Sequence, residues 1–469
     1  MLAGTRPEVA SFYHLGGGLP RLCRGTACFV ARHRDPDRWA AALAQDPPLY
    51  CLGHCDLAPA ALEDDGQPRI EVSAPRAVLL ERADVGATTL ERYGGYTALE
   101  QAKRIPRETL VESIEASGLR GRGGAAFPTG RKWRAIVAQP DPTRFVVVNA
   151  DEGDPGAYSD RILLERDPHA TIEGLAIAAH AIGARRAFLY LRREYPRAER
   201  VLHAALAEAR PLLGRELGLE IELVVGAGSY VCGEETSLLE SIEGKRPMVR
   251  ARPPYPTERG LHGKPTLVQN VETLANVPWI VRHGAAAYAA LGHSNSRGTK
   301  LVSLNSLFRR PGLYEVELGT PVRRIVEELG GGLADGRLAG VLIGGPLAGI
   351  LPPALLDTPF AFEELRAVGA SVGHGGIVAF DQRTSVVDLL LHAFEFGAFE
   401  SCGKCTPCRL GSRRVVEMLS VPSRHRQAEV AEVVSALRLT SLCGLGSGLA
   451  ELADSVSRYY PEELARCLA

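Results

Sequence analysis

The order of apolar runs and helical periodicities in the middle of the chain predicts a doubly wound α/β domain. Residues 145–148 form a continuous apolar run, as in strands that are buried on both faces of a parallel sheet. Residues 172–181 and 198–209 have helical periodicity, and residues 187–191 and 221–225 have the pattern of further strands. Parallel sheets bind ligands beyond the carboxyl ends of their strands, so the polar stretch that begins at Asn149 is a candidate ligand site.

The second half of the chain changes pattern twice. Strand-like segments at residues 300–304 and 312–318, followed by a helical segment at 322–329, indicate a small β-grasp unit. Apolar positions then recur at helical spacing through residues 386–394 and 428–439. This spacing predicts a C-terminal helical bundle.

The composition indicates several domains and no affinity for polyanions. A chain of 469 residues predicts about three or four domains. Its 54 basic and 55 acidic residues nearly cancel, so we expect no nucleic-acid binding. No apolar run approaches the roughly eighteen residues of a membrane-spanning helix, and the first thirty residues lack the apolar core of a signal peptide. We therefore expect a cytoplasmic location without direct membrane insertion.

Four cysteines in the C-terminal region have the spacing of an iron–sulfur site. Cys402, Cys405 and Cys408 are each separated by two residues, and Cys443 follows in a distant segment. A cubane cluster needs four thiolates, and a C-x2-C-x2-C turn supplies three of them. The pattern favours a [4Fe–4S] cluster and electron transfer. A structural zinc site with four cysteine ligands is the alternative.

A second group of cysteines lies near the start of the chain. Cys23 and Cys28 form one pair, and Cys51 and Cys55 form another. The sequence predicts a short helix at residues 37–44 and a strand at 48–50 between the pairs. Two pairs of thiolates suit the two irons of a [2Fe–2S] cluster, and a zinc site or an empty domain is the alternative. Grouped cysteines of this kind fit metal ligation in a reducing compartment better than disulfides.

A glycine-rich loop precedes the apolar run at residues 145–148. Residues 118–130 contain five glycines, and Arg120, Arg122 and Lys132 add positive charge in or beside the loop. Without Cβ atoms, backbone amides can approach an anionic or flat ligand closely. The loop matches neither a Walker motif nor a dinucleotide fingerprint, so an ordinary flexible turn is the alternative.

Five long segments, taken in order, resemble one protein family. They are GLRGRGGAAFPTGRKW at residues 118–133, NADEGDPGAYSDR at 149–161, GAGSYVCGEETSLLESIEG at 226–244, GKPTLVQNVETLANV at 263–277 and ESCGKCTPCRLG at 400–411. The chain resembles the NADH- and FMN-binding (51 kDa-type) flavoprotein subunit of respiratory complex I. The same module is the diaphorase subunit of NAD-reducing hydrogenases and of NAD-dependent, metal-containing formate dehydrogenases. The resemblance covers residues 110–469 and implies an oxidoreductase with FMN, NAD(H) and a [4Fe–4S] cluster.

The resemblance also implies a fold for each part of the chain. We expect an α/β multidomain protein with a thioredoxin-like [2Fe–2S] domain at residues 1–82, a linker at 83–109, a Rossmann-like FMN- and NADH-binding domain at 110–296, a β-grasp (ubiquitin-like) domain at 297–366 and a helical [4Fe–4S] domain at 367–469.

Roles for individual residues follow from the same resemblance. The FMN contacts would be Gly121, Arg122, Gly123, Lys132, Asn149, Asp151, Glu152, Tyr230, Gly233, Glu234, Asn270 and Thr273. The NAD(H) contacts would be Phe127, Lys132, Asp154, Tyr230, Glu235 and Tyr255. Glu235 would bind the hydroxyls of the adenosine ribose and repel a 2′-phosphate, so NADH is preferred to NADPH. No side chain is expected to act as a catalytic nucleophile or base, because FMN carries the hydride chemistry.

Asp154 separates the branches of this family. Complex I subunits commonly have glutamate at this position, whereas DEGDPG, here residues 151–156, is familiar from hydrogenase and formate dehydrogenase relatives. We therefore expect the diaphorase subunit of an NAD-dependent formate dehydrogenase. Its partners would be a small thioredoxin-like [2Fe–2S] subunit and a large catalytic iron–sulfur subunit of molybdopterin or hydrogenase type. The NADH-input subunit of complex I and a hydrogenase subunit are alternatives, and a non-enzymatic zinc-bound scaffold is the alternative from another class.

Overall fold

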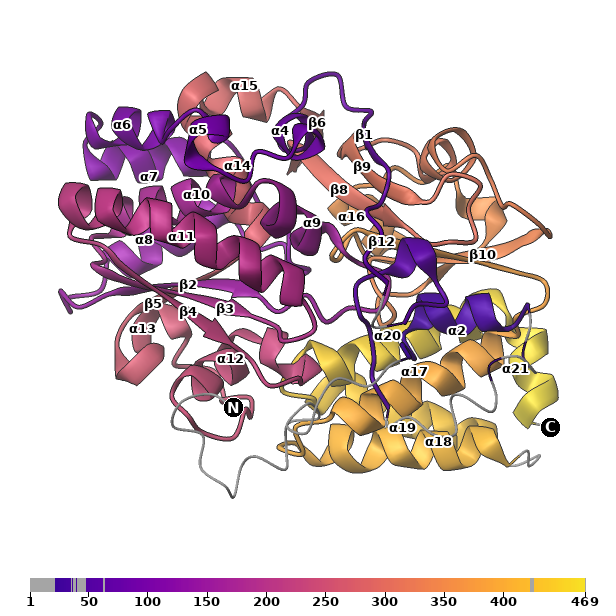
Figure 1. Ribbon diagram of the computed structural model, residues 1–469. Coiled ribbons are helices and arrows are strands. Elements are labelled where there is room, and N and C mark those ends of the chain that lie inside the picture. The colour runs from indigo at the N-terminus through magenta and orange to yellow at the C-terminus, as the bar shows by residue number, and fades with distance from the viewer. Residues whose placement is uncertain are drawn as a thin grey trace.

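Three parts of the molecule pack against one another. The computed structural model describes residues 22–34, 36, 39, 48–61, 64–421 and 426–468. Figure 1 shows an α/β domain, a six-stranded sheet beside it and a bundle of helices below that sheet. The first described residues run along the junction of the three parts, and α2 (Thr26–Arg32) lies on the bundle.

A four-stranded parallel sheet forms the centre of the α/β domain. Its strands lie in the order β4 (Glu220–Val225), β3 (Arg186–Leu191), β2 (Phe145–Ala150) and β5 (Thr266–Asn270). Val147 of β2 is in register with Phe188 on one side and Val268 on the other. The strands predicted at residues 145–148, 187–191 and 221–225 are confirmed.

Helices cover both faces of this sheet. α10 (Pro168–Ile182), α11 (Pro196–Leu217) and α14 (Val271–His283) share one hydrophobic core with Val146 and Val148. α12 (Glu235–Ile242) packs on the opposite face with Val147 and Phe188 (Figure 1). Successive strand residues face opposite sides, so an all-apolar strand can serve both layers. The helices predicted at residues 172–181 and 198–209 are confirmed within α10 and α11.

Shorter helices complete the α/β domain. They are α7 (Arg107–Ala116), α8 (Thr129–Val137), α9 (Ser159–Arg166), η2 (Tyr230–Gly233), α13 (Pro256–Arg259), η3 (Leu261–Gly263) and α15 (Ala285–Ala289).

Residues 83–109, which we expected to be a linker, are helical and packed onto the α/β domain. They comprise the end of α4 (Leu80–Val85), α5 (Leu90–Tyr93), α6 (Thr97–Lys103) and the start of α7. The buried carboxylate of Glu173 in α10 accepts hydrogen bonds from the Tyr93 hydroxyl at 2.5 Å and from the Ala98 amide at 2.8 Å. The linker prediction is wrong because these short helices obtain their stability from a partner 75 residues later in the chain.

The six-stranded sheet extends beyond the boundaries expected for the β-grasp domain. Its order is β1 (Ile70–Val72), β9 (Gly312–Glu317), β8 (Thr299–Leu304), β12 (Gly376–Asp381), β10 (Leu338–Ile343) and β11 (Ile350–Leu351). β12 lies in the centre, parallel to β8 and antiparallel to β10. A domain that ended at residue 366 would lose this central strand. The same region contains β6 (Gly292–His293), β7 (Ser296–Arg297), η4 (Arg324–Leu329), η5 (Pro353–Leu355) and α16 (Phe362–Ala367).

The C-terminal region is a helical bundle, as predicted. It contains α17 (Val386–Glu400), η6 (Pro407–Gly411), α18 (Ser412–Ser420), α19 (Arg426–Thr440), α20 (Gly444–Tyr459) and α21 (Pro461–Leu468). Phe29 of α2 stacks on His392 of α17, with ring centroids 4.2 Å apart. None of the helices in the described part of the chain combines the length and apolar character needed to cross a bilayer.

In the described part of residues 1–82, the only named strand, β1, joins the six-stranded sheet. The thioredoxin-like domain expected at residues 1–82 includes many residues outside the described ones, so it stays a prediction. Residues 48–50, predicted as a strand, have no regular structure. The other elements there are α2, η1 (Cys55–Leu57) and the first residues of α4. The helix predicted at residues 37–44 falls almost entirely outside the described residues.

Candidate functional site

The ends of the parallel strands gather most of the predicted cofactor residues at one edge of the sheet. Asn149 and Asn270 lie in register at the ends of the neighbouring strands β2 and β5. The side-chain amide of Asn149 donates to the carbonyl of Gly233, 2.7 Å away, and so ties together the loops that follow β2 and β4. We call residues 118–132, 149–156, 226–235 and 270–273 the cofactor edge. Sheets of this kind bind nucleotides at such edges.

The glycine-rich loop lies against the start of α14. The amide of Arg122 donates to the hydroxyl of Thr273 at 2.8 Å, and the Asn270 side chain caps α14 by accepting from the Thr273 amide at 3.1 Å. A Cβ atom on Gly123 would lie 2.9 Å from the Cβ of Asn270, so only glycine permits this approach. Loop amides beside a helix N-terminus favour an anion, which fits the phosphate of FMN.

The side chain of Arg122 is buried, and only one of its three nitrogens has hydrogen-bond partners. It is 1% exposed, and its Nη2 donates to the Tyr288 hydroxyl at 2.9 Å and to the Arg297 carbonyl at 2.6 Å. Its Nε and Nη1 are buried without a hydrogen-bond partner. Buried donors are nearly always satisfied in native proteins, so these two atoms fit an anionic ligand beside the loop.

Two carboxyl groups of the cofactor edge are available to a polar ligand. Burial raises the pKa of Asp151 well above its ordinary value, which favours the neutral carboxyl group, a hydrogen-bond donor. Glu234 caps α12 through Oε2, which accepts from the amides of Thr236 and Ser237 at 3.0 and 2.9 Å. Its Oε1 is buried without a hydrogen-bond partner. One donor and one acceptor suit the hydroxyl and ring amide groups of a flavin.

Glu152 has a structural role that the sequence did not reveal. Its side chain is fully buried and accepts hydrogen bonds from the amides of Asp160 and Arg161, both at 3.1 Å. The hydroxyls of Ser159 and Tyr195 donate to the same carboxylate at 3.1 and 3.0 Å. These bonds cap the N-terminus of α9 and leave Glu152 little capacity for FMN, to which we had assigned it.

Tyr230 connects the nucleotide side of the cofactor edge with the iron–sulfur side. Its hydroxyl donates to the Asp154 carboxylate at 2.6 Å, and its backbone amide donates to the Glu400 carboxylate at 2.9 Å. The ring packs edge-on against Phe396 of α17, with centroids 4.9 Å apart. Glu400 precedes Cys402 by two residues. A displacement of Tyr230 would therefore affect both the nucleotide side and the segment that carries Cys402.

The predicted NAD(H) residues form a charged group with two exposed aromatic rings nearby in the sequence. The Lys132 ammonium lies 2.7 Å from Glu235, and the Arg252 guanidinium lies 3.3 Å from the same carboxylate. Although burial opposes ionisation, Lys132 and then Arg252 lower the pKa of Glu235, so it is anionic at neutral pH. Phe127 and Tyr255 are 50% and 52% exposed, so their rings can stack on a base, although the Arg131 guanidinium lies over the Phe127 ring at 5.9 Å from its centroid.

The four C-terminal cysteines lie between the bundle and the cofactor edge. Cys402 follows α17, Cys408 is in η6, and Cys443 is the residue before α20. Cys402 and Cys443 pack with Val231 of the loop after β4. A Cβ on Gly446 would lie 3.4 Å from the Cβ of Cys408, which shows how closely the two segments approach.

The described cysteine sulfurs are not gathered as closely as one zinc ion would hold them. Burial raises the pKa of Cys408 to about 11 and that of Cys443 to about 12, so these thiols ionise at neutral pH only with a metal. A tetrahedral zinc ion with Zn–S bonds of about 2.3 Å holds its sulfurs about 3.8 Å apart. Among the described residues, no three cysteine sulfurs lie within 4.8 Å of one another. A cubane, whose four irons carry one thiolate each, holds its ligands farther apart.

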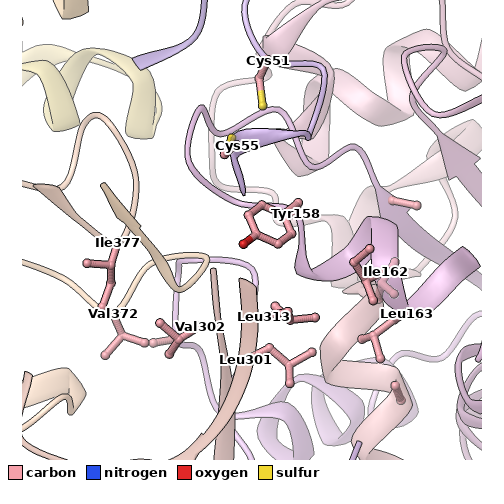
Figure 2. Close-up of a cluster of buried hydrophobic side chains, with 14 of the residues drawn as sticks. Cys51, Cys55, Tyr158, Ile162, Leu163, Leu301, Val302, Leu313, Val372 and Ile377 are labelled. Atoms are coloured by element: carbon pink, nitrogen blue, oxygen red, sulfur yellow. The ribbon is translucent and has the colours of Figure 1, made fainter. Parts of the chain in front are cut away.

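Cys23, Cys28, Cys51 and Cys55 also come together, buried at the junction of the three parts. Figure 2 shows Cys51 and Cys55 beside Tyr158, on the side of the cluster opposite to strand residues such as Leu301.

Three residues near the cofactor edge escaped the sequence analysis. Arg252 pairs with Glu235, Glu400 accepts from Tyr230, and His374 lies 3.6 Å from the Asp154 carboxylate. Each belongs to a segment far from the glycine-rich loop. Only Arg252 had a local signal, its place before Pro253, Pro254 and the predicted contact Tyr255.

Comparisons with known proteins agree with this geometry. The profile of the Nuo51 FMN-binding domain matches residues 114–279, and that of the NADH-ubiquinone oxidoreductase-F iron-sulfur binding region matches residues 388–467. A NADH-quinone oxidoreductase subunit of Rhizobium meliloti is 43% identical over 380 residues, 78% of this chain and 89% of that protein. The HndC subunit of the NADP-reducing hydrogenase of Solidesulfovibrio fructosivorans is 40% identical over 365 residues, 75% of this chain and 74% of that protein.

A solved structure resembles almost the whole chain. A chain of NAD+-reducing [NiFe]-hydrogenase in the H2-reduced state is 32% identical and superposes with a TM-score of 0.85, covering 98% of this chain and 87% of that one. The zinc-bound scaffold that the sequence left open has no support in these matches. The chain belongs to the 51 kDa-type family of NADH dehydrogenase subunits, oxidoreductases that bind FMN, NADH and a [4Fe–4S] cluster.

Proposed function

We propose that this protein is the diaphorase subunit of an NAD-dependent formate dehydrogenase. It would exchange a hydride between NAD(H) and FMN at the cofactor edge and single electrons with the cluster held by Cys402, Cys405, Cys408 and Cys443. The observation that carries the proposal is the double contact of the loop after β4. Glu234 and Glu235 of this loop face the nucleotide side, and its Val231 packs against Cys402 and Cys443.

The FMN would lie between the glycine-rich loop and the two strand ends. The amide of Gly123 and the unpartnered nitrogens of the Arg122 side chain would receive its phosphate, because the amides of Gly121 and Arg122 already donate to the Phe127 carbonyl and the Thr273 hydroxyl. The rest of FMN would be bound by hydrogen bonds with Gly121, Asn149, Asp151, Gly233, Glu234, Asn270 and Thr273. When bound, FMN accepts a hydride as an electron pair and releases the electrons singly. The protonated carboxyl group of Asp151 would donate a hydrogen bond to a flavin oxygen or nitrogen. The tie between Asn149 and Gly233 would keep both loops at a fixed separation.

The nucleotide would be selected through the Lys132–Glu235–Arg252 group. The Glu235 carboxylate, held at 2.7 Å from Lys132, would accept hydrogen bonds from the ribose hydroxyls and repel a 2′-phosphate. Phe127 and Tyr255 would stack on the nicotinamide or adenine rings. Asp154 and Tyr230, hydrogen-bonded to each other, would close the pocket on the iron–sulfur side.

Asp154 supports the formate dehydrogenase branch. With an aspartate at this position, the carboxylate reaches both the Tyr230 hydroxyl and His374. Gly345 leaves room for this carboxylate, because a Cβ at that position would lie 3.2 Å from Asp154 Oδ2. The partners would be a small [2Fe–2S] subunit and a large molybdopterin subunit.

A hydrogenase is the second candidate for the parent complex. A chain of NAD+-reducing [NiFe]-hydrogenase superposes on 98% of this chain, and the HndC subunit of an NADP-reducing hydrogenase is 40% identical over 75% of it. These two likenesses support a hydrogenase as the second candidate.

The experiment is to purify the chain from its source with its partners under anaerobic conditions. We expect NADH–ferricyanide reductase activity from the isolated subunit and formate-dependent NAD+ reduction by the complex. Hydrogen-dependent NAD+ reduction together with a nickel-containing partner would assign the chain to a hydrogenase. Co-purification with membrane subunits and quinone reductase activity would assign it to complex I.

A further inference from the structure

A turn of the six-stranded sheet reaches the cofactor edge and carries a histidine. His374 lies in this turn, immediately before β12, and its carbonyl accepts a hydrogen bond from the ammonium of Lys300 in β8 at 3.0 Å. A Cβ on Gly376, the first residue of β12, would lie 2.8 Å from the carbonyl carbon of Gly156. The turn is therefore fixed between its own sheet and the loop that follows β2.

The residues around His374 hold the turn in one conformation. Gly373 and Gly375 have φ angles of +50° and +85°, and a Cβ on either would collide with a backbone carbonyl oxygen, that of Gly344 or that of Leu301. Figure 2 shows Val372 and Ile377, which flank the turn in the sequence, in the buried cluster that also contains Leu301. The imidazole of His374 is thus presented from a rigid support.

The imidazole of His374 faces three acidic side chains and the glycine-rich loop. Its Nε2 lies 3.6 Å from Oδ2 of Asp154, which is too long for a direct hydrogen bond. One of its ring nitrogens and one carboxylate oxygen each of Glu152 and Asp160 lie within 4.8 Å of one another. A Cβ on Gly124 would lie 3.9 Å from Cδ2 of His374. The ring therefore borders both predicted ligand sites, that of FMN and that of NAD(H).

Asp160 connects His374 with the buried side of the cofactor edge. Its carboxyl group accepts a hydrogen bond at 2.6 Å from the side-chain amide of Asn270, a predicted FMN contact. Burial, and then the neighbouring Glu152 and Glu272, raise the pKa of Asp160 and favour its neutral form. Asp160 is 1% exposed, whereas the side chain of His374 is 16% exposed. The two groups lead from the dry interior towards solvent.

This group of side chains suits a proton better than a metal ion. Each carboxylate oxygen of Glu152 already accepts two hydrogen bonds, and a metal ion would have to displace these donors. The neutral form of Asp160 is a poor metal ligand, because metal ions bind carboxylates after deprotonation. An imidazole and a carboxyl group in contact with each other can instead pass a proton between them.

The exchange of a hydride leaves one proton to be moved. A hydride consists of two electrons and one proton, and an iron–sulfur cluster takes only the electrons, one at a time. Each NADH oxidised therefore leaves one proton at the cofactor edge, and each NAD+ reduced takes one up there. Imidazole gains and loses a proton near neutral pH, and it can accept at one nitrogen while it releases at the other.

We propose that His374 carries this proton between the cofactor edge and solvent. In NADH oxidation, one ring nitrogen would accept the proton that remains after the electrons have passed to the cluster, and the other nitrogen would release a proton to water. NAD+ reduction would use the same groups in the opposite direction. The inference rests on the hydride exchange given under Proposed function and holds for each candidate parent complex.

The test compares electron transfer with proton release in the FMN-loaded chain. One equivalent of NADH is mixed with the chain and ferricyanide in weakly buffered solution with a pH indicator, and flavin and indicator are followed by stopped flow. In His374→Gln we expect flavin reduction within about twofold of wild type and proton release slower by at least about tenfold. Added imidazole should restore the rate in His374→Ala.

His293→Gln is the matched control. His293 is in the same part of the molecule and also pairs with a carboxylate, that of Glu364 at 3.1 Å, but its side chain is 51% exposed. This variant should release the proton at the wild-type rate. A merely structural effect of His374 would not respond to imidazole.

The position of His374 is tested without turnover. In the chain freed of FMN and labelled with 13C at histidine, the NMR signal that is missing in His374→Gln belongs to His374. We expect this signal to shift when FMN is added and the signal of His293 to stay unchanged. The absence of a shift would place His374 away from the flavin and overturn the proposal.

The kinetic outcomes separate this proposal from the function on which it rests. Wild-type proton release in His374→Gln, or no effect of imidazole on a slowed His374→Ala with full FMN content, would overturn the role of His374 while the diaphorase function stands. Failure of the wild-type chain to bind FMN or to reduce ferricyanide with NADH would overturn both.

Discussion

The ammonium of Lys132 lies 2.7 Å from the carboxylate of Glu235, and both residues face the predicted nucleotide site. Arg252 approaches the same carboxylate to 3.3 Å. Glu235 is therefore an anion between two cations, and the balance of charge at this point decides which nucleotide is accepted.

The variant Glu235→Gln should admit NADPH. It keeps the size of the side chain, removes the charge that repels a 2′-phosphate, and leaves Lys132 without its carboxylate partner and Arg252 with only Glu234, 3.9 Å away. We expect the ratio of kcat/KM for NADPH to that for NADH to rise by about ten- to a hundredfold, which corresponds to roughly 1.4 to 2.7 kcal/mol. The measurement is steady-state ferricyanide reduction with each nucleotide.

Glu240→Gln is the matched control for this experiment. Glu240 is on the same helix, α12, but pairs with Arg250 at 2.5 Å instead of Lys132. The control should leave the ratio unchanged. An unchanged ratio in Glu235→Gln as well would show that the carboxylate does not face the adenosine ribose.

Asp151 should retain FMN through a donated hydrogen bond. Burial raises the pKa of Asp151 well above the ordinary range and so favours its neutral form, whose hydrogen-bond donor asparagine can replace. We expect Asp151→Asn to keep most of the FMN and Asp151→Ala to weaken its binding by about ten- to a hundredfold. Fluorescence of FMN released on dilution measures both. Equal loss in the two variants would mean that the charge or the side-chain volume matters, not the donor.

The strands of the α/β domain could be predicted from the sequence because the apolar residues that are buried in each strand follow one another in the chain. Val147 and its neighbours are buried on both faces, and such strands consist of uninterrupted apolar residues. The loops that follow them are also marked locally, since Gly123 allows an approach that any side chain would block.

Contacts between distant segments could not be predicted in this way. Ile70 of β1 pairs with Leu313, and three residues are too few to show a strand pattern. In the sequence, Glu152 has the position of a ligand-binding residue in a loop. The groups that donate hydrogen bonds to its carboxylate belong to α9, seven to nine residues later. The four N-terminal cysteines suggested a familiar domain, but the sequence did not show how they lie against the rest of the chain, where the Cys51 sulfur is 3.7 Å from the Asp154 carbonyl oxygen.

Asp167 should make stability depend on pH in a defined direction. Burial, partly offset by Arg82 at 3.2 Å, raises the pKa of Asp167 from 3.8 to about 6. Between these two values the folded chain keeps the proton and the unfolded chain releases it. The contribution of Asp167 to the free energy of unfolding therefore falls as pH rises from about 4 to about 6, by about 3 kcal/mol, and is constant above.

The variant Asp167→Asn isolates this contribution. The free energy of unfolding of the variant minus that of the wild type should increase by about 3 kcal/mol between pH 4 and pH 7. Urea denaturation followed by circular dichroism at several pH values gives the difference. Asp141→Asn is the control, because Lys264 lowers the pKa of the exposed Asp141 and the difference for this variant should stay nearly flat between pH 4 and pH 7. A flat difference for Asp167→Asn would show that its carboxyl group is ionised in the folded chain at all these pH values.

Cys443 should be needed for electron exit but not for hydride transfer. It is the residue before α20, and its loss leaves the cubane with three thiolates. The groups assigned to NAD(H) and FMN lie on other segments of the chain. In Cys443→Ser we expect NADH to reduce the flavin, seen as bleaching of its absorbance, at a rate within about twofold of wild type. The rate of electron transfer to the clusters of a partner subunit should fall by at least about a hundredfold.

Stopped-flow absorbance measures the two steps separately. Cys467→Ser, which removes a partly exposed thiol at the end of α21, should change neither. Slow flavin bleaching in Cys443→Ser with full FMN content would mean that the cluster, through the contact of Cys443 with Val231, also shapes the nucleotide site.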